Sequence, residues 1–452
     1  GIKMTEMKIN SESSSFDFVG GKWQSEINVR DFIQKNYTPY YGDSRFLADP
    51  TEATTKLWEE CCELFKKERE NGGVLDLDTK VVSSITSHGA GYIDKDLEKS
   101  GLVIEPHIFT VKTSADNLGD DKGTDNHKIG AFAFYNKGLF DDEKKEVPLV
   151  LGFHGGGDSC FFFATMAGWA NIAHNNNFLL VTIENHLNST ATEMLEVINE
   201  LKKTYNIDET KIYSTGFSMG GCKTWDLFQE YPEVFAAVAP MDATFEVGTN
   251  VFANPALRLN QDTILPVFYV GGELTPLPEL PFQAEKCRER MEYVLKVNRA
   301  KADYNVSFED RDNWQNPIWG IDGDVVCTAK DENKNSVLTM HLFESENGCC
   351  YCVFGSASNQ MHEMRHLNCE NAWKYMSRFK RLTDGGIEGG KMKEIEHIFA
   401  HCPVRRILHA GREGLVQRLS KQGYKFCADI DCHGTASFTY IDIFIISQFF
   451  PK

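Results

Sequence analysis

Apolar runs and amphipathic segments alternate along the middle of the chain, from about Val103 to Leu382. Short runs rich in β-branched and aromatic residues predict strands, and longer segments with apolar positions every three or four residues predict helices. This alternation predicts an α/β fold, a mostly parallel sheet flanked by helices. The predicted strands are Ile129–Tyr135, Pro148–Phe153, Phe178–Ile183, Lys211–Thr215, Phe235–Pro240, Leu265–Val270 and Cys349–Phe354. The predicted helices are Ala191–Tyr205, Met219–Gln229, Leu280–Val297 and Leu367–Arg381.

The pattern divides the chain into three unequal parts: residues 1–102, 103–384 and 385–452. The first part is charged and mainly helical. One helix is predicted over Thr51–Asn71, because Thr51 can cap it, an apolar stripe follows, and Gly72 and Gly73 end it. The last part is a tail of unknown role with a predicted helix at Met392–Phe399.

Composition narrows the classes of partner. The 452 residues are 42% apolar and 25% charged, which is ordinary for a globular protein. A formal charge of −18 argues against nucleic acid or an anionic membrane as a partner, since both need a basic surface. The longest apolar run, Tyr440–Phe450, is too short for a membrane span.

The cysteines bear on the cellular location. There are thirteen, an odd number without framework spacing, and they favour reduced thiols in a cytoplasm. No secretion signal is visible at the N-terminus, although a removed leader stays an open alternative.

The strongest chemical signal is Gly-x-Ser-x-Gly at Gly216–Gly220, between a predicted strand and a predicted helix. A serine on so tight a turn needs small neighbours, and the turn exposes its hydroxyl at the start of the helix. Ser218 is therefore the candidate nucleophile. The backbone amide of Met219, immediately after it, is a candidate oxyanion donor.

A second glycine run, His154–Gly157, follows the strand Pro148–Phe153. Glycines let the backbone approach a substrate and turn its amides toward a developing oxyanion. Gly156 and Gly157 are the remaining candidate oxyanion donors, at the position where an α/β-hydrolase has such a loop.

The serine needs a base and an orienting acid, which follow in the chain order Ser, acid, His. His362 stands on a loop after the last predicted strand and is favoured as the base over His366, which lies closer to the next helix.

The acid has three candidates. Glu273, just past a buried strand, is favoured. Asp242, past the preceding strand, is an alternative acid, and Glu279 is a further one from the same loop as Glu273.

Residues 128–382 resemble the α/β-hydrolase esterases related to feruloyl esterases and polyhydroxybutyrate depolymerases. The matching stretches are His154–Gly157, Tyr205–Asp208, Gly216–Gly221 and Tyr231–Val238. The resemblance implies hydrolysis of short-chain, aryl (feruloyl-type) or polymeric esters through an acyl-serine, with no metal and no organic cofactor. A long insertion between acid and base, Asp310–Leu342, departs from the family and suggests a hairpin and part of a lid.

The first part resembles a different family, pyruvate formate-lyase, over about residues 10–100. The matching stretches are Asp31–Tyr40, Phe46–Ala48, Pro50–Thr54, Lys67–Asp76 and Ser87–Glu98. The resemblance ends near Ser100, before that family's paired active-site cysteines and its glycyl-radical loop. It implies a fragment without radical activity, fused to the hydrolase naturally or at an assembly junction.

Two rival functions follow from these likenesses. A serine peptidase of the prolyl-oligopeptidase type shares the Gly-x-Ser-x-Gly turn, but the first part shows no repeat of the kind a propeller needs. A formate acetyltransferase-related radical enzyme would need the catalytic parts that the resemblance does not reach.

Overall fold

The computed structural model describes residues 101–112, 127–155, 159–186, 189–243, 258–275, 277–399 and 404–405, with single positions between 56 and 70. The described positions between Lys56 and Glu70 are helical, in agreement with the helix predicted over Thr51–Asn71. The other residues up to 100 and the run Tyr440–Phe450 lie outside the described residues.

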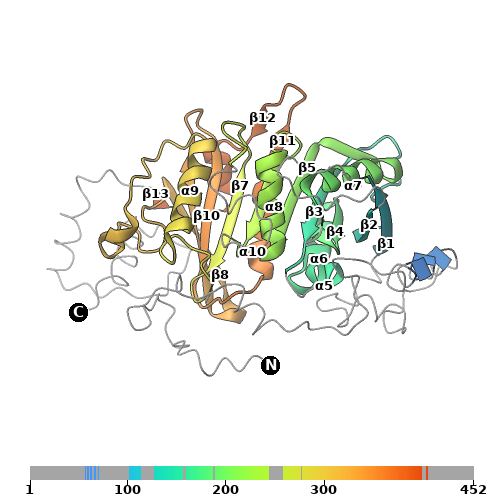
Figure 1. Cartoon of the computed structure of the whole chain (residues 1–452), viewed down its shortest axis with the longest axis horizontal. Coiled ribbons are helices and arrows are strands. Elements are labelled where there is room, and N and C mark those ends of the chain that lie inside the picture. The colour runs from blue at the N-terminus through green and yellow to red at the C-terminus, as the bar shows by residue number, and fades with distance from the viewer. Residues whose placement is uncertain are drawn as a thin grey trace.

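Among the described residues, eleven strands form one sheet in the order β1-β2-β4-β3-β5-β6-β7-β10-β9-β8-β13 (Figure 1). These strands are β1 (Leu102–Val111), β2 (His127–Asn136), β3 (Val147–Phe153), β4 (Leu179–Ile183), β5 (Ile207–Phe217), β6 (Ala237–Met241), β7 (Val267–Gly272), β8 (Val325–Asp331), β9 (Ser336–Glu344), β10 (Cys350–Ala357) and β13 (Val404–Arg405). A separate two-stranded ribbon pairs β11 (Phe379–Arg381) with β12 (Ile387–Gly389).

The centre of the sheet is parallel and its two sides are antiparallel. Neighbours run parallel from β4 through β3, β5, β6 and β7 to β10. On one side β2 pairs antiparallel with both β4 and β1, and on the other β9, β8 and β13 continue antiparallel from β10. This sheet, with the strand–turn–helix unit after β5, is that of an α/β-hydrolase, as the sequence predicts.

Helices cover both faces of the sheet. They are α5 (Cys160–Met166), α6 (Trp169–Asn176), α7 (Ala191–Thr204), α8 (Met219–Glu230), α9 (Glu285–Val297), α10 (His366–Met376) and α11 (Met392–Ile398), with short 3-10 turns η7 (Phe308–Asn313) and η8 (Glu332–Lys334). None of the helices in the described part of the chain has the length and apolar character of a bilayer span.

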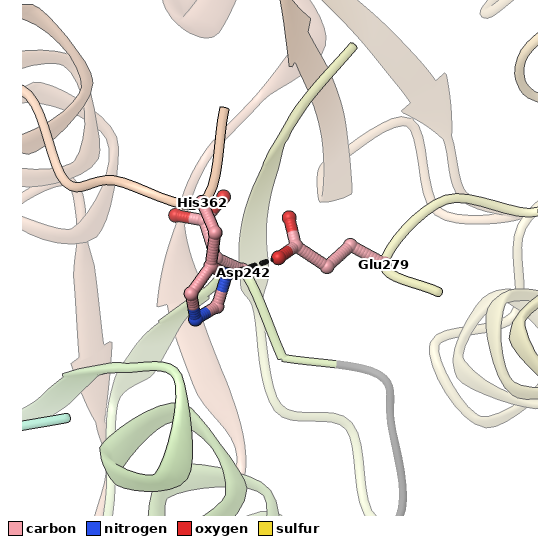
Figure 2. Close-up of side chains that lie close together, drawn as sticks. All are labelled: Asp242, Glu279 and His362. Atoms are coloured by element: carbon pink, nitrogen blue, oxygen red, sulfur yellow. Dashed lines mark hydrogen bonds and ion pairs between the residues drawn. The ribbon is translucent and has the colours of Figure 1, made fainter. Parts of the chain in front are cut away.

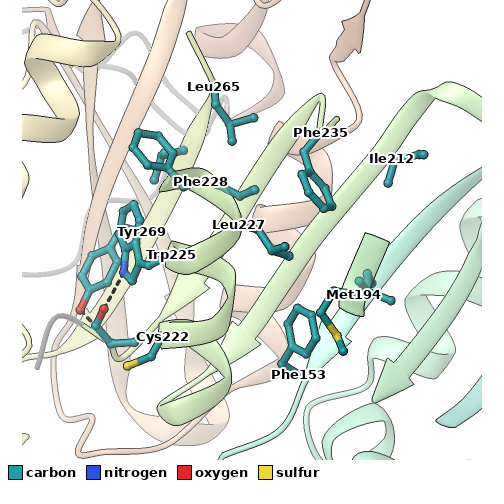
Figure 3. Close-up of a cluster of buried hydrophobic side chains, with 14 of the residues drawn as sticks. Phe153, Met194, Ile212, Cys222, Trp225, Leu227, Phe228, Phe235, Leu265 and Tyr269 are labelled. Carbon is teal, nitrogen blue, oxygen red and sulfur yellow. Dashed lines mark hydrogen bonds between the residues drawn. The ribbon is translucent and has the colours of Figure 1, made fainter. Parts of the chain in front are cut away.

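The core is two apolar clusters, one on each face. Successive residues of β3 alternate between them: Val150 belongs to the cluster that includes side chains of α5, α6, α10 and α11, whereas Leu149 and Leu151 belong to the cluster that includes side chains of α7, α8 and α9. This is the two-residue period of a strand buried on both faces. Figure 3 shows the second cluster around α8, where Trp225 and Phe228 meet side chains from the neighbouring strands.

The predicted strands and helices of the middle part are found, although several of their ends differ and β1, α5 and α6 were not predicted. The helix predicted to begin at Leu280 begins at Glu285. The helix predicted to reach Arg381 ends at Met376, and the chain then enters β11. The insertion Asp310–Leu342 does contain a hairpin, β8 and β9, but these strands extend the main sheet beyond β10.

The packed body also extends past residue 384. The amide of Cys350 donates to Gly390 O (2.8 Å), and the amide of Met392 donates to Gly348 O (3.0 Å). Ile395 on α11 is fully buried, and the ring of Phe399 lies 6.2 Å from that of Phe268 on β7. Residues 387–399 are therefore part of the hydrolase core.

We expect Ile395→Ala to lower the free energy of unfolding by about 2–4 kcal/mol, because it removes buried methyl groups and leaves a cavity. Glu388→Ala, in the exposed β12, is the control and should stay within about 0.5 kcal/mol of wild type. Chemical denaturation of both variants checks this. Equal stabilities would mean that residues 387–399 do not contribute to the core.

Candidate active site

Ser218 lies on a strained turn between β5 and α8. Its backbone has φ 57° and ψ −119°, a conformation that costs a non-glycine residue on the order of 1–3 kcal/mol. Two backbone hydrogen bonds hold it, from its amide to Met241 O on β6 (3.0 Å) and from the amide of Cys222 to its carbonyl (3.0 Å). The strain is thus imposed by the sheet on one side and the helix on the other.

The turn also depends on the absence of side chains at its two glycines. A Cβ at Gly216 would lie 2.1 Å from Gly220 O, and one at Gly220 would lie 2.1 Å from Phe153 O on β3. Both distances are far inside van der Waals contact, so the backbones touch where any other residue would separate them. The glycine requirement inferred from the sequence agrees with this packing.

His362 comes from the loop between β10 and α10 and reaches the serine. Its Nε2 lies 2.9 Å from Ser218 Oγ, and its Nδ1 hydrogen-bonds Glu279 Oε1. The ring packs against Phe217, with centroids 4.9 Å apart, and all three polar side chains are buried. A carboxylate can only accept, so Nδ1 carries the proton and Nε2 is left to accept from the serine hydroxyl.

Glu279 is held in place by its own loop, which follows β7. Its Oε1 accepts from Thr275 Oγ1 (2.9 Å), and its backbone carbonyl accepts from the Tyr269 hydroxyl (2.8 Å). Gln283 closes the loop by accepting from the Glu279 amide (2.8 Å) and donating to Thr275 O (3.0 Å). The carboxyl group is therefore fixed before any substrate arrives.

Glu273, the acid favoured from the sequence, is elsewhere. Its Oε1 accepts from Ser356 Oγ on β10 (2.9 Å), and its amide donates to Ala357 O (3.0 Å). The histidine loop crosses directly over the end of β7, where a Cβ on Gly272 would lie 2.3 Å from Met361 O. The carboxylate that meets the imidazole is Glu279, which stood among the alternatives.

Asp242, the other alternative acid, lies beside the same imidazole (Figure 2). One donor atom each from Asp242, Glu279 and His362 lie within 4.8 Å of one another, and all three residues are buried. Such a group could in principle hold a cation. Both nitrogens of His362 are engaged, however, by Ser218 and Glu279.

The remaining candidates are the three oxyanion donors and the alternative base. Gly156 and Gly157 lie outside the described residues. Met219 is the first residue of α8, directly after the serine. His366 is not at the serine: its Nδ1 lies 2.9 Å from Ala167 O, and its Nε2 lies 3.4 Å from a carboxylate oxygen of Glu370. It ties the start of α10 to the turn before α6.

The base of the glycine loop is anchored by buried polar residues that follow β3 and β4. The His154 ring has Nδ1 2.7 Å from Gly155 O and Nε2 in contact with Glu184 O at the end of β4. His186 Nε2 in turn lies 2.7 Å from His154 O, and the Glu184 carboxylate accepts from the amide of Cys160 (2.7 Å). Burial lowers the pKa of His186 well below its usual value, so this histidine is neutral.

Comparisons with known proteins match the N-terminal part of the chain to one family and the remainder to solved structures of another kind. Residues 22–100 match the family model described as pyruvate formate lyase-like. Formate acetyltransferase of Haemophilus influenzae is 55% identical over 96 residues, which are 21% of this chain and 12% of that enzyme. The N-terminal resemblance is thereby confirmed, and the chain spans only that small share of the relative's length.

Solved structures similar to this chain are esterases and related hydrolases. A thermostable esterase shares 22% identity over 42% of this chain and 52% of its own, with a TM-score of 0.29. S-formylglutathione hydrolase from Staphylococcus aureus shares 14% over 44% and 86%, with a TM-score of 0.33. The feruloyl esterase module of Clostridium thermocellum, complexed with sinapinate, shares 18% over 46% and 78%, with a TM-score of 0.32. These likenesses concern the fold alone.

Gly220→Ala tests the backbone contact on which the serine turn depends. We expect it to lower the free energy of unfolding by about 2–3 kcal/mol or more, because the new methyl group must displace the end of β3. Gly138→Ala is the matched control: its methyl group would meet nothing closer than 3.4 Å and should not lower stability. Denaturant titration of both variants measures this free energy. A Gly220→Ala protein as stable as the control would show that stability does not depend on the contact between Gly220 and β3.

Proposed function

We propose that this chain is a serine carboxylic-ester hydrolase that acts through an acyl-serine intermediate. The observation that carries the proposal is the hydrogen-bonded series from Ser218 Oγ to His362 Nε2 (2.9 Å) and from His362 Nδ1 to Glu279. Nucleophile, base and orienting carboxylate are the parts that acyl transfer needs, with the base between the other two.

In the proposed reaction, neutral His362 takes the hydroxyl proton as Ser218 attacks the ester carbonyl. Glu279 stabilises the imidazolium that forms, and the imidazolium then returns the proton to the departing alcohol. Water repeats the sequence on the acyl-serine and releases the acid. No metal or organic cofactor takes part in these steps.

The oxyanion of the tetrahedral intermediate needs donors in front of the serine. The amide of Met219 is suited to this, because the first amides of a helix have no partner within it and point along the axis. Gly156 and Gly157 are proposed as the second source of amides on the sequence pattern alone. Loss of one such donor typically costs roughly 3 kcal/mol of transition-state stabilisation.

The proposed substrates are short-chain or aryl esters, and polyesters are a further class to test. Initial rates on p-nitrophenyl acetate, p-nitrophenyl butyrate, methyl ferulate and a polyester film would rank them. A peptide p-nitroanilide in the same panel tests the peptidase alternative, and hydrolysis of that compound with none of the esters would favour it. Assays in air, without a radical-activating enzyme, separate either hydrolysis from formate acetyltransferase chemistry.

Ser218→Ala should lower kcat on p-nitrophenyl butyrate by roughly 10⁵-fold or more, because no other group can form the acyl intermediate. The control is Ser377→Ala, which removes an exposed hydroxyl at the end of α10 and should leave kcat unchanged. Circular dichroism confirms that both variants fold. Turnover retained by Ser218→Ala would reject the proposal.

A pair of glutamine substitutions tests which carboxylate orients the imidazole. Glu279→Gln should lower kcat by roughly 10³- to 10⁴-fold, because the amide cannot stabilise the imidazolium and can hold the wrong tautomer. Glu273→Gln changes the same atoms six residues earlier on the same loop and should leave kcat close to wild type. If the two results were exchanged, Glu273 would be the acid and the loop would rearrange during catalysis.

A further inference from the structure

Two buried carboxyl groups meet at the imidazole, where the proposed reaction needs one. Asp242 ends β6 and Glu279 belongs to the loop after β7, and neither side chain is exposed to solvent. One carboxylate oxygen of Asp242 lies within 4.8 Å of one of Glu279. In the described part of the chain, no donor from any other group reaches Asp242 Oδ2 or Glu279 Oε2.

Two carboxyl groups this close can hydrogen-bond each other only if one of them carries a proton, because an ionised carboxylate has acceptors only. Two like charges at this separation in a buried site cannot both persist. The pair therefore holds one proton and one negative charge.

The surroundings decide which group is ionised. Glu279 Oε1 already accepts from Thr275 Oγ1 (2.9 Å) and from the His362 ring, and both donors favour an anion. Asp242 Oδ1 accepts one longer bond, from the amide of Gly272 (3.3 Å). Burial, and then the charge of Glu279, raise the pKa of Asp242 well above its usual value. The proton thus belongs to Asp242.

Other titratable groups around Asp242 do not change this assignment. Besides Glu279 and His362, those among the described residues are Tyr269 on β7 and Cys369 on α10. Burial raises the pKa of both the phenol and the thiol well above their usual values, so both are neutral. His362 favours the charged form of Asp242, but its Nδ1–H bond is made to Glu279.

The backbone holds Asp242 in this position. Its φ is 51°, a left-handed conformation that aspartate and asparagine adopt more readily than most residues, and its amide donates to Val270 O (2.8 Å). The next residue, Ala243, is clamped by Trp225 Nε1, which donates to its carbonyl (2.6 Å), and by the Tyr269 hydroxyl, which accepts from its amide (3.2 Å). Figure 3 shows these two bonds inside the core.

We propose that Asp242 is a positioning residue for the Ser218–His362–Glu279 series: a neutral carboxylic acid that donates to Glu279 and keeps that group ionised. Burial raises the pKa of Glu279 to about 8, and Asp242 and Thr275 act against a larger rise. The proton stays on Asp242 throughout the reaction. The pair then presents one negative charge to the imidazolium, so that the imidazolium can still release its proton to the leaving group. This role rests on the proposed function.

The test compares Asp242→Asn with Asp242→Ala on p-nitrophenyl butyrate over a range of pH. Asparagine keeps an acceptor for Gly272 and a donor for Glu279, tolerates the left-handed backbone and cannot ionise. We expect it to keep kcat/KM within about threefold of wild type, with the acid side of the pH profile unchanged. Alanine removes the donor, so Glu279 takes up a proton more readily.

We expect Asp242→Ala to lower kcat/KM at pH 7 by roughly 10- to 100-fold, with the acid side of the profile moved up by about one pH unit. The loss should shrink as the pH rises and Glu279 ionises, whereas a merely structural defect would lower activity equally at every pH. Thermal unfolding of both variants checks that they fold.

Two results would overturn the inference. If Asp242→Asn lost as much activity as Glu279→Gln, Asp242 would be the ionised acid. If the alanine and asparagine variants had the same pH profile, the donated hydrogen bond would be without effect. Infrared spectroscopy gives a further test. At neutral pH, wild type should show a carboxylic-acid band that Asp242→Asn lacks, and a wild type without this band would also overturn the inference. A wild type without esterase activity would reject the proposed function and the positioning role with it, and the band would then still decide where the proton lies.

Discussion

The contact between Ser218 Oγ and His362 Nε2 is the interaction on which the site depends, and it joins residues 144 positions apart in the chain. The parallel centre of the sheet makes it possible. The strands β3, β5, β6, β7 and β10 all end at the same edge, so the loops that follow them meet there. Each polar group of the site comes directly from such a loop: the serine after β5, Asp242 after β6, Glu279 after β7 and the histidine after β10.

Close backbone packing then fixes the distances that topology alone leaves free. At the serine turn, Gly220 lies against the end of β3, and at the end of β7, Gly272 lies against Met361 in the histidine loop. Each contact replaces a side chain by a neighbouring backbone, which brings two loops closer than any other residue would allow. The strained φ of Ser218 persists because both sides of the turn are held in this way.

Local patterns predicted most of the fold and two of the three members of the hydrogen-bonded series. The strands of the parallel centre, α7 and α8 follow from periodicity, and Ser218 and His362 follow from their places beside strands. The acid did not follow. Glu273 stands nearer the end of β7, but the route of the loop past Gly272 takes it to Ser356 on β10 and brings Glu279 to the imidazole. That route is set by Gln283 and Tyr269, which are partners in space, and nothing in the spacing of the two glutamates reveals it. The packing of Ile395 was hidden for the same reason, since seven residues of helix do not show which surface covers them.

The pair formed by Asp242 and Glu279 explains why this chain has a carboxyl group at both positions from which an acid can reach the imidazole, after β6 and after β7. Burial shields the site from water, which strengthens the bond between carboxylate and imidazole but also disfavours the charge on the carboxylate. A donor with no charge of its own resolves this conflict, because it stabilises the anion without adding a second one. Thr275 supplies one such donor, and in our proposal protonated Asp242 supplies the other. Trp225 and Tyr269, which hydrogen-bond the backbone of Ala243, then contribute to the chemistry, because they hold the residue next to that donor. The hydrophobic core and the proposed catalytic series are thus connected through a single buried proton.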